Sequence, residues 1–169
     1  MSKKSKEQYA TELLAYFYPI HYQVNMVLED FMRGSLTRRE AALLWLVYQE
    51  GGVDCSLPRK LVVDKLRRWF EATSSNVTKI IAHLASPKLA LVRIVNEHGS
   101  ARDKRVGLTA QGRSSVRGML RKGATHPLLT RMSEQEIRAG IAFFRMAYAA
   151  TSSELPMEKT DLKHSRRDP

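Results

Sequence analysis

The chain has 169 residues, of which 43% are hydrophobic and 27% are charged, a composition typical of a globular protein of about one domain. Its single cysteine excludes a disulfide framework and a site built from several thiolates. Its longest apolar runs are too short to cross a bilayer, and no signal-peptide hydrophobic stretch follows the charged start. We therefore expect a cytoplasmic protein without a membrane partner.

The basic residues are concentrated in the middle of the chain. Lysine and arginine number 28 against 17 acidic residues, a net charge of +11. Positions 59 to 122 hold fifteen basic and four acidic residues, so this stretch carries the whole excess and both flanks are neutral. Such asymmetry favours a polyanion, above all nucleic acid, over a basic surface that only keeps the protein soluble. We expect these cations to converge on a single surface.

Helical periodicity dominates the first half of the sequence. Apolar residues between positions 8 and 31 follow one helix face, and Pro19 is expected to bend or split that helix. The segment Thr37–Glu40 matches a capping box. It predicts a helix over residues 38–49, which ends at Gly51-Gly52.

Two further helices follow. The first spans residues 59–70, with Val62, Leu66, Trp69 and Phe70 expected to face inward. Trp45, in the preceding helix, is likewise interpreted as a packing residue.

The next helix, over residues 74–85, divides sharply into two faces. Thr73 is a good N-cap residue. Val77, Ile80, Ile81 and Leu84 fall on one face. The other face carries short polar and basic side chains: Ser75, Asn76, Thr78, Lys79 and His83.

The clearest strand signals come next. Residues 91–95 are rich in β-branched and aliphatic side chains, residues 105–108 form a weaker second strand, and a polar basic tip joins them. Thr109 then caps a fifth helix to about residue 121. A second capping box, Ser133–Glu136, opens a last long helix that runs to about residue 152.

This element order is that of a winged helix-turn-helix. The predicted fold is mainly α with a small β-hairpin wing, and long helices at the N- and C-termini. A DNA major groove admits one helix, and the helix over residues 74–85 has the apolar back and polar front that such insertion requires. The preceding helix would anchor the DNA backbone, and the hairpin tip would reach the minor groove. The candidate DNA-binding residues are Thr73, Ser74, Ser75, Asn76, Thr78, Lys79, Arg67, Arg68, Arg102, Lys104 and Arg105.

Four segments together carry a family resemblance: Leu36-Thr37, residues 73–79 with Leu84, Leu91-Val92, and residues 108–112. They resemble the MarR (multiple antibiotic resistance regulator) family of transcriptional regulators. The resemblance covers residues 36–118. There are two departures: residues 53–70 are longer and more basic than usual, and the family's wing Asp-x-Arg falls on Ser100-Ala101-Arg102, which lacks the acid. The resemblance implies dimerisation helices at both ends and a small-molecule effector pocket between them and the DNA-binding domain.

We accordingly divide the chain into four parts: a dimerisation helix over residues 1–35, the DNA-binding domain over residues 36–122, a second dimerisation helix over residues 123–152, and a disordered tail over residues 153–169. The alternative to dimer formation is that the terminal helices pack on each other within one monomer. We call the helix over residues 74–85 the reading helix, because it is expected to enter the major groove. A homodimer with two-fold symmetry would place its two reading helices about 34–36 Å apart on a palindromic site. The sequence thus predicts a sequence-specific regulator of transcription that binds double-stranded DNA and acts as a repressor.

Other functions find little support. Histidines lack metal-binding spacing, and phosphate loops and nucleophile motifs are absent from the sequence, so we expect no enzyme, metal or cofactor. Zinc sensing through His83 or His98, and oxidation sensing by Cys55, remain less favoured alternatives. The main alternative from another class is a helical protein–protein adaptor whose basic surface docks an acidic partner. RNA binding is disfavoured because the hairpin lacks aromatic residues for base stacking.

Overall fold

The computed structural model describes residues 4–96 and 104–153, and the chain divides into two compact units, residues 1–126 and 127–169. The described residues are mainly helical and include a small antiparallel sheet, which confirms the predicted fold class. None of the helices in these ranges has the length and hydrophobicity needed to cross a bilayer.

The N-terminal segment is a broken helix, as its proline predicts. It comprises α1 (Lys6–Ala15), α2 (Phe17–Pro19), the π-helix η1 (Ile20–Asn25) and α3 (Met26–Arg33). Pro19 has no amide hydrogen, so the α-helical hydrogen-bond pattern is interrupted there and the following turn widens into a π-helix. The apolar stripe of this segment is therefore not one continuous α-helical face.

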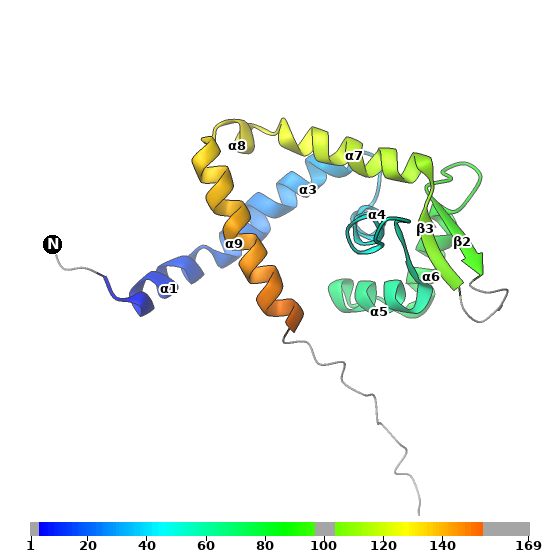
Figure 1. The fold of residues 1–169 in the computed structure, drawn as a ribbon, viewed down its shortest axis with the longest axis horizontal. Coiled ribbons are helices and arrows are strands. Elements are labelled where there is room, and N and C mark those ends of the chain that lie inside the picture. Colours follow the sequence, from blue (N-terminus) through cyan, green and yellow to red (C-terminus); the bar gives the residue numbers. More distant parts are fainter. Residues whose placement is uncertain (1–3, 97–103, 154–169) are drawn as a thin grey trace, which may run out of the picture. The chain divides into compact units, whose positions relative to one another are not determined.

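Three helices form the centre of the first unit: α4 (Arg38–Glu50), α5 (Arg59–Phe70) and α6 (Ser74–Leu84). The capping box at the start of α4 is confirmed. The Glu40 amide donates to Thr37 Oγ1 at 3.4 Å, and the Thr37 amide donates to Glu40 Oε2 at 2.8 Å. In Figure 1, α4 lies between α7 on one side and α5 on the other.

The sheet contains the predicted hairpin and one additional strand. The hairpin is made by β2 (Val92–Asn96) and β3 (Lys104–Leu108), paired from Val92 opposite Leu108 to Asn96 opposite Lys104. The additional strand, β1 (Ser56–Pro58), pairs antiparallel with the other side of β3, so the sheet order is β1-β3-β2. With three residues and a terminal proline, β1 has no alternating pattern that sequence could reveal.

The chain continues with α7 (Ala110–Ala124), capped by Thr109, whose hydroxyl accepts from the Gly112 amide at 3.0 Å. In the second unit, α8 (Pro127–Thr130) was not predicted, and α9 (Glu134–Ser153) begins at the expected capping box. In the first unit α3 packs on α7, and the side chain of Met32 lies next to Gly123.

Most of the predicted core residues are buried. The fully buried side chains come from α4, α5, α6, β3 and α7, and include Leu43, Leu46, Val62, Leu66, Val77, Ile81, Leu84, Val106, Leu108 and Val116. The prediction for Trp69 was wrong, because its side chain is 49% exposed. It lies in the last turn of α5, where it lines an open cavity instead of being enclosed by the core. Trp45 packs against the core as expected.

Candidate nucleic-acid interface

Helix α6 has the two faces that the sequence predicted. Val77, Ile81 and Leu84 are buried against the core of the first unit, whereas Ser75 and Lys79 are exposed on the opposite side. Asn76 and His83 are exposed on one flank of this outer face, and Thr78 lies half-buried on the other flank. The outer face is therefore free to enter a groove without disturbing the packing that holds the helix.

The N-terminus of α6 suits a phosphate. Thr73 caps the helix, its hydroxyl accepting from the Asn76 amide at 3.2 Å. Thr73, Ser74 and Ser75 are exposed, and the first turn holds no acidic residue. The remaining first-turn amides and the positive end of the helix dipole are therefore open to an anion.

The hydroxyl of Thr78 is already engaged within the protein. It donates to the Ser74 carbonyl one turn earlier at 2.9 Å, and it accepts from Arg59 Nη2 at 3.0 Å. Because a threonine hydroxyl has one proton, Thr78 has none left to donate to a base. The half-buried Arg59, which was not among the predicted site residues, is thereby held beside α6.

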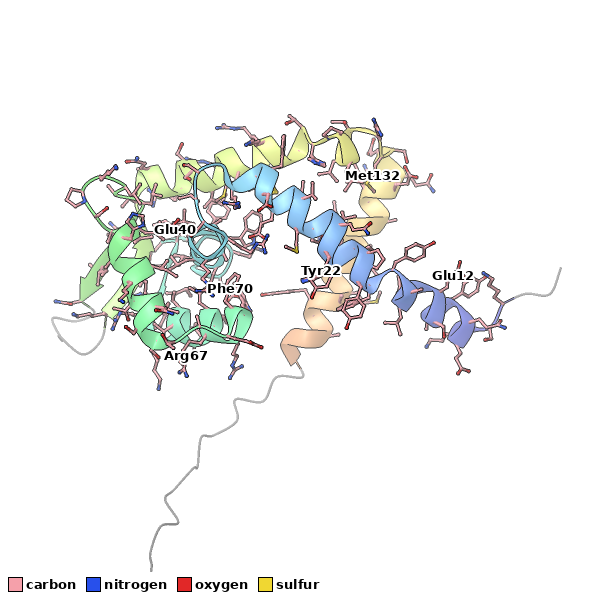
Figure 2. All side chains as sticks on the ribbon, turned by 180° about the vertical axis from the view of Figure 1, so that it is seen from behind. Glu12, Tyr22, Glu40, Arg67, Phe70 and Met132 are labelled. Carbon is pink, nitrogen blue, oxygen red and sulfur yellow. The ribbon has the colours of Figure 1, made fainter. Side chains whose placement is uncertain are left out.

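Arg67 and Arg68 are both exposed in the last turn of α5, where positive charge also complements the helix dipole. Arg67 lies at the lower side of the first unit in Figure 2. Their neighbour Lys65 is different, because its ammonium lies 2.5 Å from the Glu50 carboxylate. Arg67 and Arg68 are thus placed to meet an external anion, whereas Lys65 is neutralised internally.

The two predicted wing cations that the structure describes, Lys104 and Arg105, differ in whether the side chain is held by other residues. Lys104 is exposed at the start of β3. Arg105 is held against β1, because its Nε donates to Ser56 Oγ at 3.1 Å and its Nη2 to the Ser56 carbonyl at 2.9 Å. Arg102, together with the rest of the hairpin tip over residues 97–103, lies outside the described residues.

His83 on α6 contacts a buried carboxylate on α4. Its Nδ1 lies 2.7 Å from Glu40 Oε1, while Glu40 also caps α4 through Thr37. Burial works to raise the pKa of Glu40, but hydrogen bonds from the Thr37 backbone and from His83 hold it below its ordinary value. This carboxylate thus joins the start of α4 to the second half of α6.

Replacing Glu40 by alanine is expected to destabilise the first unit by about 1 kcal/mol, since the change removes half of the capping box and leaves the Thr37 amide without its side-chain acceptor. Glu40→Gln keeps an oxygen for the Thr37 amide and is expected to cost less. Urea unfolding of the wild type and both variants at neutral pH measures the difference.

The pH dependence of stability checks the same carboxylate. The pKa of Glu40 in the folded protein lies below the ordinary value of 4.5, so its ionised carboxylate stabilises the fold. This stabilisation is complete above about pH 4.5 and is lost as the pH falls through the folded-state pKa. The wild type should therefore lose more stability on acidification than Glu40→Gln does. Equal losses in the two proteins would contradict the role of Glu40.

The expected convergence of all the cations on one surface is only partly correct. Helix α7 buries Gly112, Val116 and Met119, which turns Arg117 and Arg121 outward on the far side of that helix. In Figures 1 and 2, α7 runs along the upper side of α4, whereas α5 lies below α4 and α6 lies beside it, toward the hairpin. The α7 arginines therefore point away from the α6 surface.

An open cavity of about 430 Å³ lies between α3, α4, the end of α5 and α7. Its size falls in the usual range for small-molecule sites. Its wall is mainly apolar and aromatic, with Leu28, Met32, Trp45, Trp69, Phe70 and Met119 among its residues. The charged groups at the cavity are already paired, since Glu29 forms an ion pair with Arg38 at 2.9 Å and Arg33 donates to Asp30 at 2.9 Å.

The described residues offer no support for the alternative metal and redox sites. Among residues 4–96 and 104–153, histidine, cysteine and acidic side chains nowhere form a group of three that would hold a metal ion. Cys55 is buried in the core rather than exposed to an oxidant. His98 lies in the part of the wing that the structure does not describe.

The fold is that of known MarR-family structures. Sco5413, a MarR family transcriptional regulator from Streptomyces coelicolor, matches with a TM-score of 0.57 and 16% identity over 87% of this chain and 98% of its own. Sco3205, a MarR family regulator from the same organism solved in complex with DNA, matches with a TM-score of 0.54 and 15% identity over 95% and 96% of the two chains. BpsR from Bordetella bronchiseptica, whose DNA binding is regulated by 6-hydroxynicotinic acid, matches with a TM-score of 0.54 and 18% identity over 80% and 98%. No family model and no curated protein matches this sequence.

Proposed function

We propose that this chain is a MarR-type transcriptional regulator that binds double-stranded DNA in a sequence-specific way and represses transcription as a homodimer on a palindromic operator. The observation that carries the proposal is α6, a helix buried along Val77, Ile81 and Leu84, whose opposite face presents Ser75 and Lys79 to solvent. Similarity to regulators of the same fold, one of them solved with DNA, supports the same function.

The predicted site residues have distinct roles in this proposal. Ser75, Asn76 and Lys79 approach base edges or phosphates in the major groove, and the Thr73–Ser75 amides receive a phosphate at the helix start. Arg67 and Arg68 hold the DNA backbone, and Lys104 with Arg102 acts in the wing. The engaged hydroxyl of Thr78 and the fixed guanidinium of Arg105 favour supporting roles for these two residues.

Selection of bound fragments from random duplex DNA tests this proposal directly. The bound sequences are expected to share an inverted repeat whose half-sites are centred about one helical turn apart. Lys79→Ala is expected to weaken binding to the selected site by about tenfold. Recovery of no common sequence would refute specific recognition. Unchanged DNA affinity in Lys79→Ala, with loss of a protein complex, would favour the adaptor alternative.

The N-terminal segment supports a homodimer. Tyr9, Leu13, Phe17 and Tyr22 are each more than half exposed along α1, α2 and η1. Within the second unit, α9 carries Ile137, Ile141, Phe144 and Tyr148, which are also exposed. Apolar surface on this scale favours a protein interface, and we propose a second copy of the chain as its partner.

Phe17→Asp is expected to weaken the dimer by at least about tenfold, because a carboxylate would be buried in an apolar interface. Sedimentation equilibrium measures the dissociation constant, and the control is Ser114→Asp, which adds the same charge at an exposed position on α7. A wild type that sediments as a monomer at micromolar concentration would rule out the homodimer.

The cavity between α3, α4, α5 and α7 supports regulation by a small molecule. Its apolar lining and internally paired charges suit a largely apolar effector. An effector there would contact α5, the helix that precedes the reading helix.

The proposed role on chromosomal DNA places the protein in the cytoplasm and assigns it no catalytic step.

A further inference from the structure

The first residue of α5 is joined to the reading helix by one hydrogen bond, and the hydroxyl that accepts it is itself bonded within that helix. Arg59 Nη2 donates to Thr78 Oγ1 at 3.0 Å, and Thr78 Oγ1 donates to the Ser74 carbonyl at 2.9 Å. Thr78 must accept from Arg59, because its proton is already given to Ser74. The guanidinium of Arg59 is therefore fixed beside the middle of α6 rather than moving freely in solvent.

Arg59 also lies at the junction between α6 and the wing. It directly follows β1, whose Pro58 lies opposite Arg105 in the register with β3. Its hydrogen bond to Thr78 reaches the flank of α6 opposite the one that carries Asn76 and His83. The backbone of Arg59 is thus attached to the wing sheet, and its side chain is attached to the reading helix.

A DNA duplex places a sugar-phosphate backbone between each major groove and the neighbouring minor groove. If α6 occupies the major groove and the wing occupies the minor groove, a cation at their junction faces this backbone. A guanidinium has five N–H donors in a planar fork that fits a phosphate. One donor is given to Thr78, and the side chain is only half-buried.

We propose that Arg59 is a DNA phosphate-contacting residue whose guanidinium is pre-oriented by Thr78. This inference rests on the proposed DNA-binding function and extends it to a residue outside the predicted site. It also gives the hydroxyl of Thr78 a role: Thr78 orients a phosphate clamp and reads no base. The competing explanation is that the Arg59–Thr78 hydrogen bond only fastens α5 to α6.

The test measures binding by fluorescence anisotropy over a series of salt concentrations, for the wild type and four variants. The probes are the duplex that the wild type selects from random DNA and a short duplex of mixed sequence. The variants are Arg59→Ala, Arg59→Lys, Thr78→Val and the Arg59→Ala/Thr78→Val double variant. Arg117→Ala is the matched control, because it removes the same charge from the outward side of α7.

Arg59→Ala is expected to weaken binding to both duplexes by at least about tenfold and to reduce the slope of log affinity against log salt by about two, because each protomer of the dimer loses one phosphate contact. Arg59→Lys should keep the slope and recover part of the affinity. Thr78→Val should weaken binding about threefold with the slope unchanged, and should add nothing in the Arg59→Ala background, because the two residues act together.

Three outcomes would overturn the assignment. Wild-type affinity and slope in Arg59→Ala, with lower thermal stability, would show a purely structural hydrogen bond. Loss of affinity for the selected duplex alone, with an unchanged slope, would show that Arg59 reads a base. A slope reduced equally by Arg117→Ala would show a general effect of net charge. Failure of the wild type to bind either duplex would instead refute the proposed function itself, and the assignment with it.

Discussion

Binding of duplex DNA is expected to weaken by roughly 10³–10⁵-fold when salt rises from about 50 to about 200 mM, the loss typical of 6–10 phosphate contacts. The reason is that bound cations release counterions from DNA, and salt opposes this release. The exposed cations on α5, α6 and β3 include Lys79, Arg67, Arg68 and Lys104. In a dimer each of them occurs twice, which is enough for that number of contacts. Fluorescence anisotropy with a labelled duplex measures the affinity at each salt concentration.

Two variants show whether the salt dependence comes from the α6 surface: Lys79→Ala tests that surface, and Arg121→Ala is the control. Lys79→Ala should bind with a shallower dependence on salt, because a cation is removed from the binding surface. Arg121→Ala, on the outward side of α7, should leave the dependence unchanged. Tight binding that does not respond to salt would contradict an interface built on phosphate contacts.

Gly112→Ala is expected to destabilise the first unit by about 3 kcal/mol or more. A Cβ atom at this position would lie 2.0 Å from the Leu91 carbonyl oxygen and 3.0 Å from its carbon. Both are backbone atoms, and the same carbonyl accepts from the Thr109 amide at 3.1 Å. The start of α7 would have to move away from the beginning of β2. Thermal unfolding should show a midpoint lower by roughly 6–12 °C.

Gly118→Ala is the matched substitution in the same helix. A Cβ at Gly118 has no atom within 4 Å, so the change should stabilise the helix by about 0.5–1 kcal/mol through propensity alone. Opposite signs for the two alanines are the expected result. A stable Gly112→Ala variant would mean that α7 does not pack against the wing at this distance.

The parts of the structure that sequence predicted well are those determined by local patterns. The two faces of α6 follow from helical periodicity, and its start follows from Thr73, whose cap needs residues within one turn. The capping box of α4 and the break at Pro19 are local in the same sense. These patterns are readable because the residues that act together are three or four positions apart.

The features that sequence missed depend on residues far apart in the chain. The hydrogen bond between Arg59 and Thr78 joins residues 19 positions apart, and the contact between His83 and Glu40 joins residues 43 positions apart. Neither pair leaves a periodic signal. Trp69 was misplaced for a related reason, since helical periodicity gives the face of a residue but not whether distant segments enclose it, and Trp69 lines the open cavity.

The short strand β1 also limits how the protein associates with copies of itself. A sheet edge offers unpaired amides and carbonyls to which a strand from another molecule can add. On this side of the sheet the edge is only three residues long and ends in Pro58, which has no amide hydrogen to donate. Strand-by-strand polymerisation through this edge is therefore disfavoured.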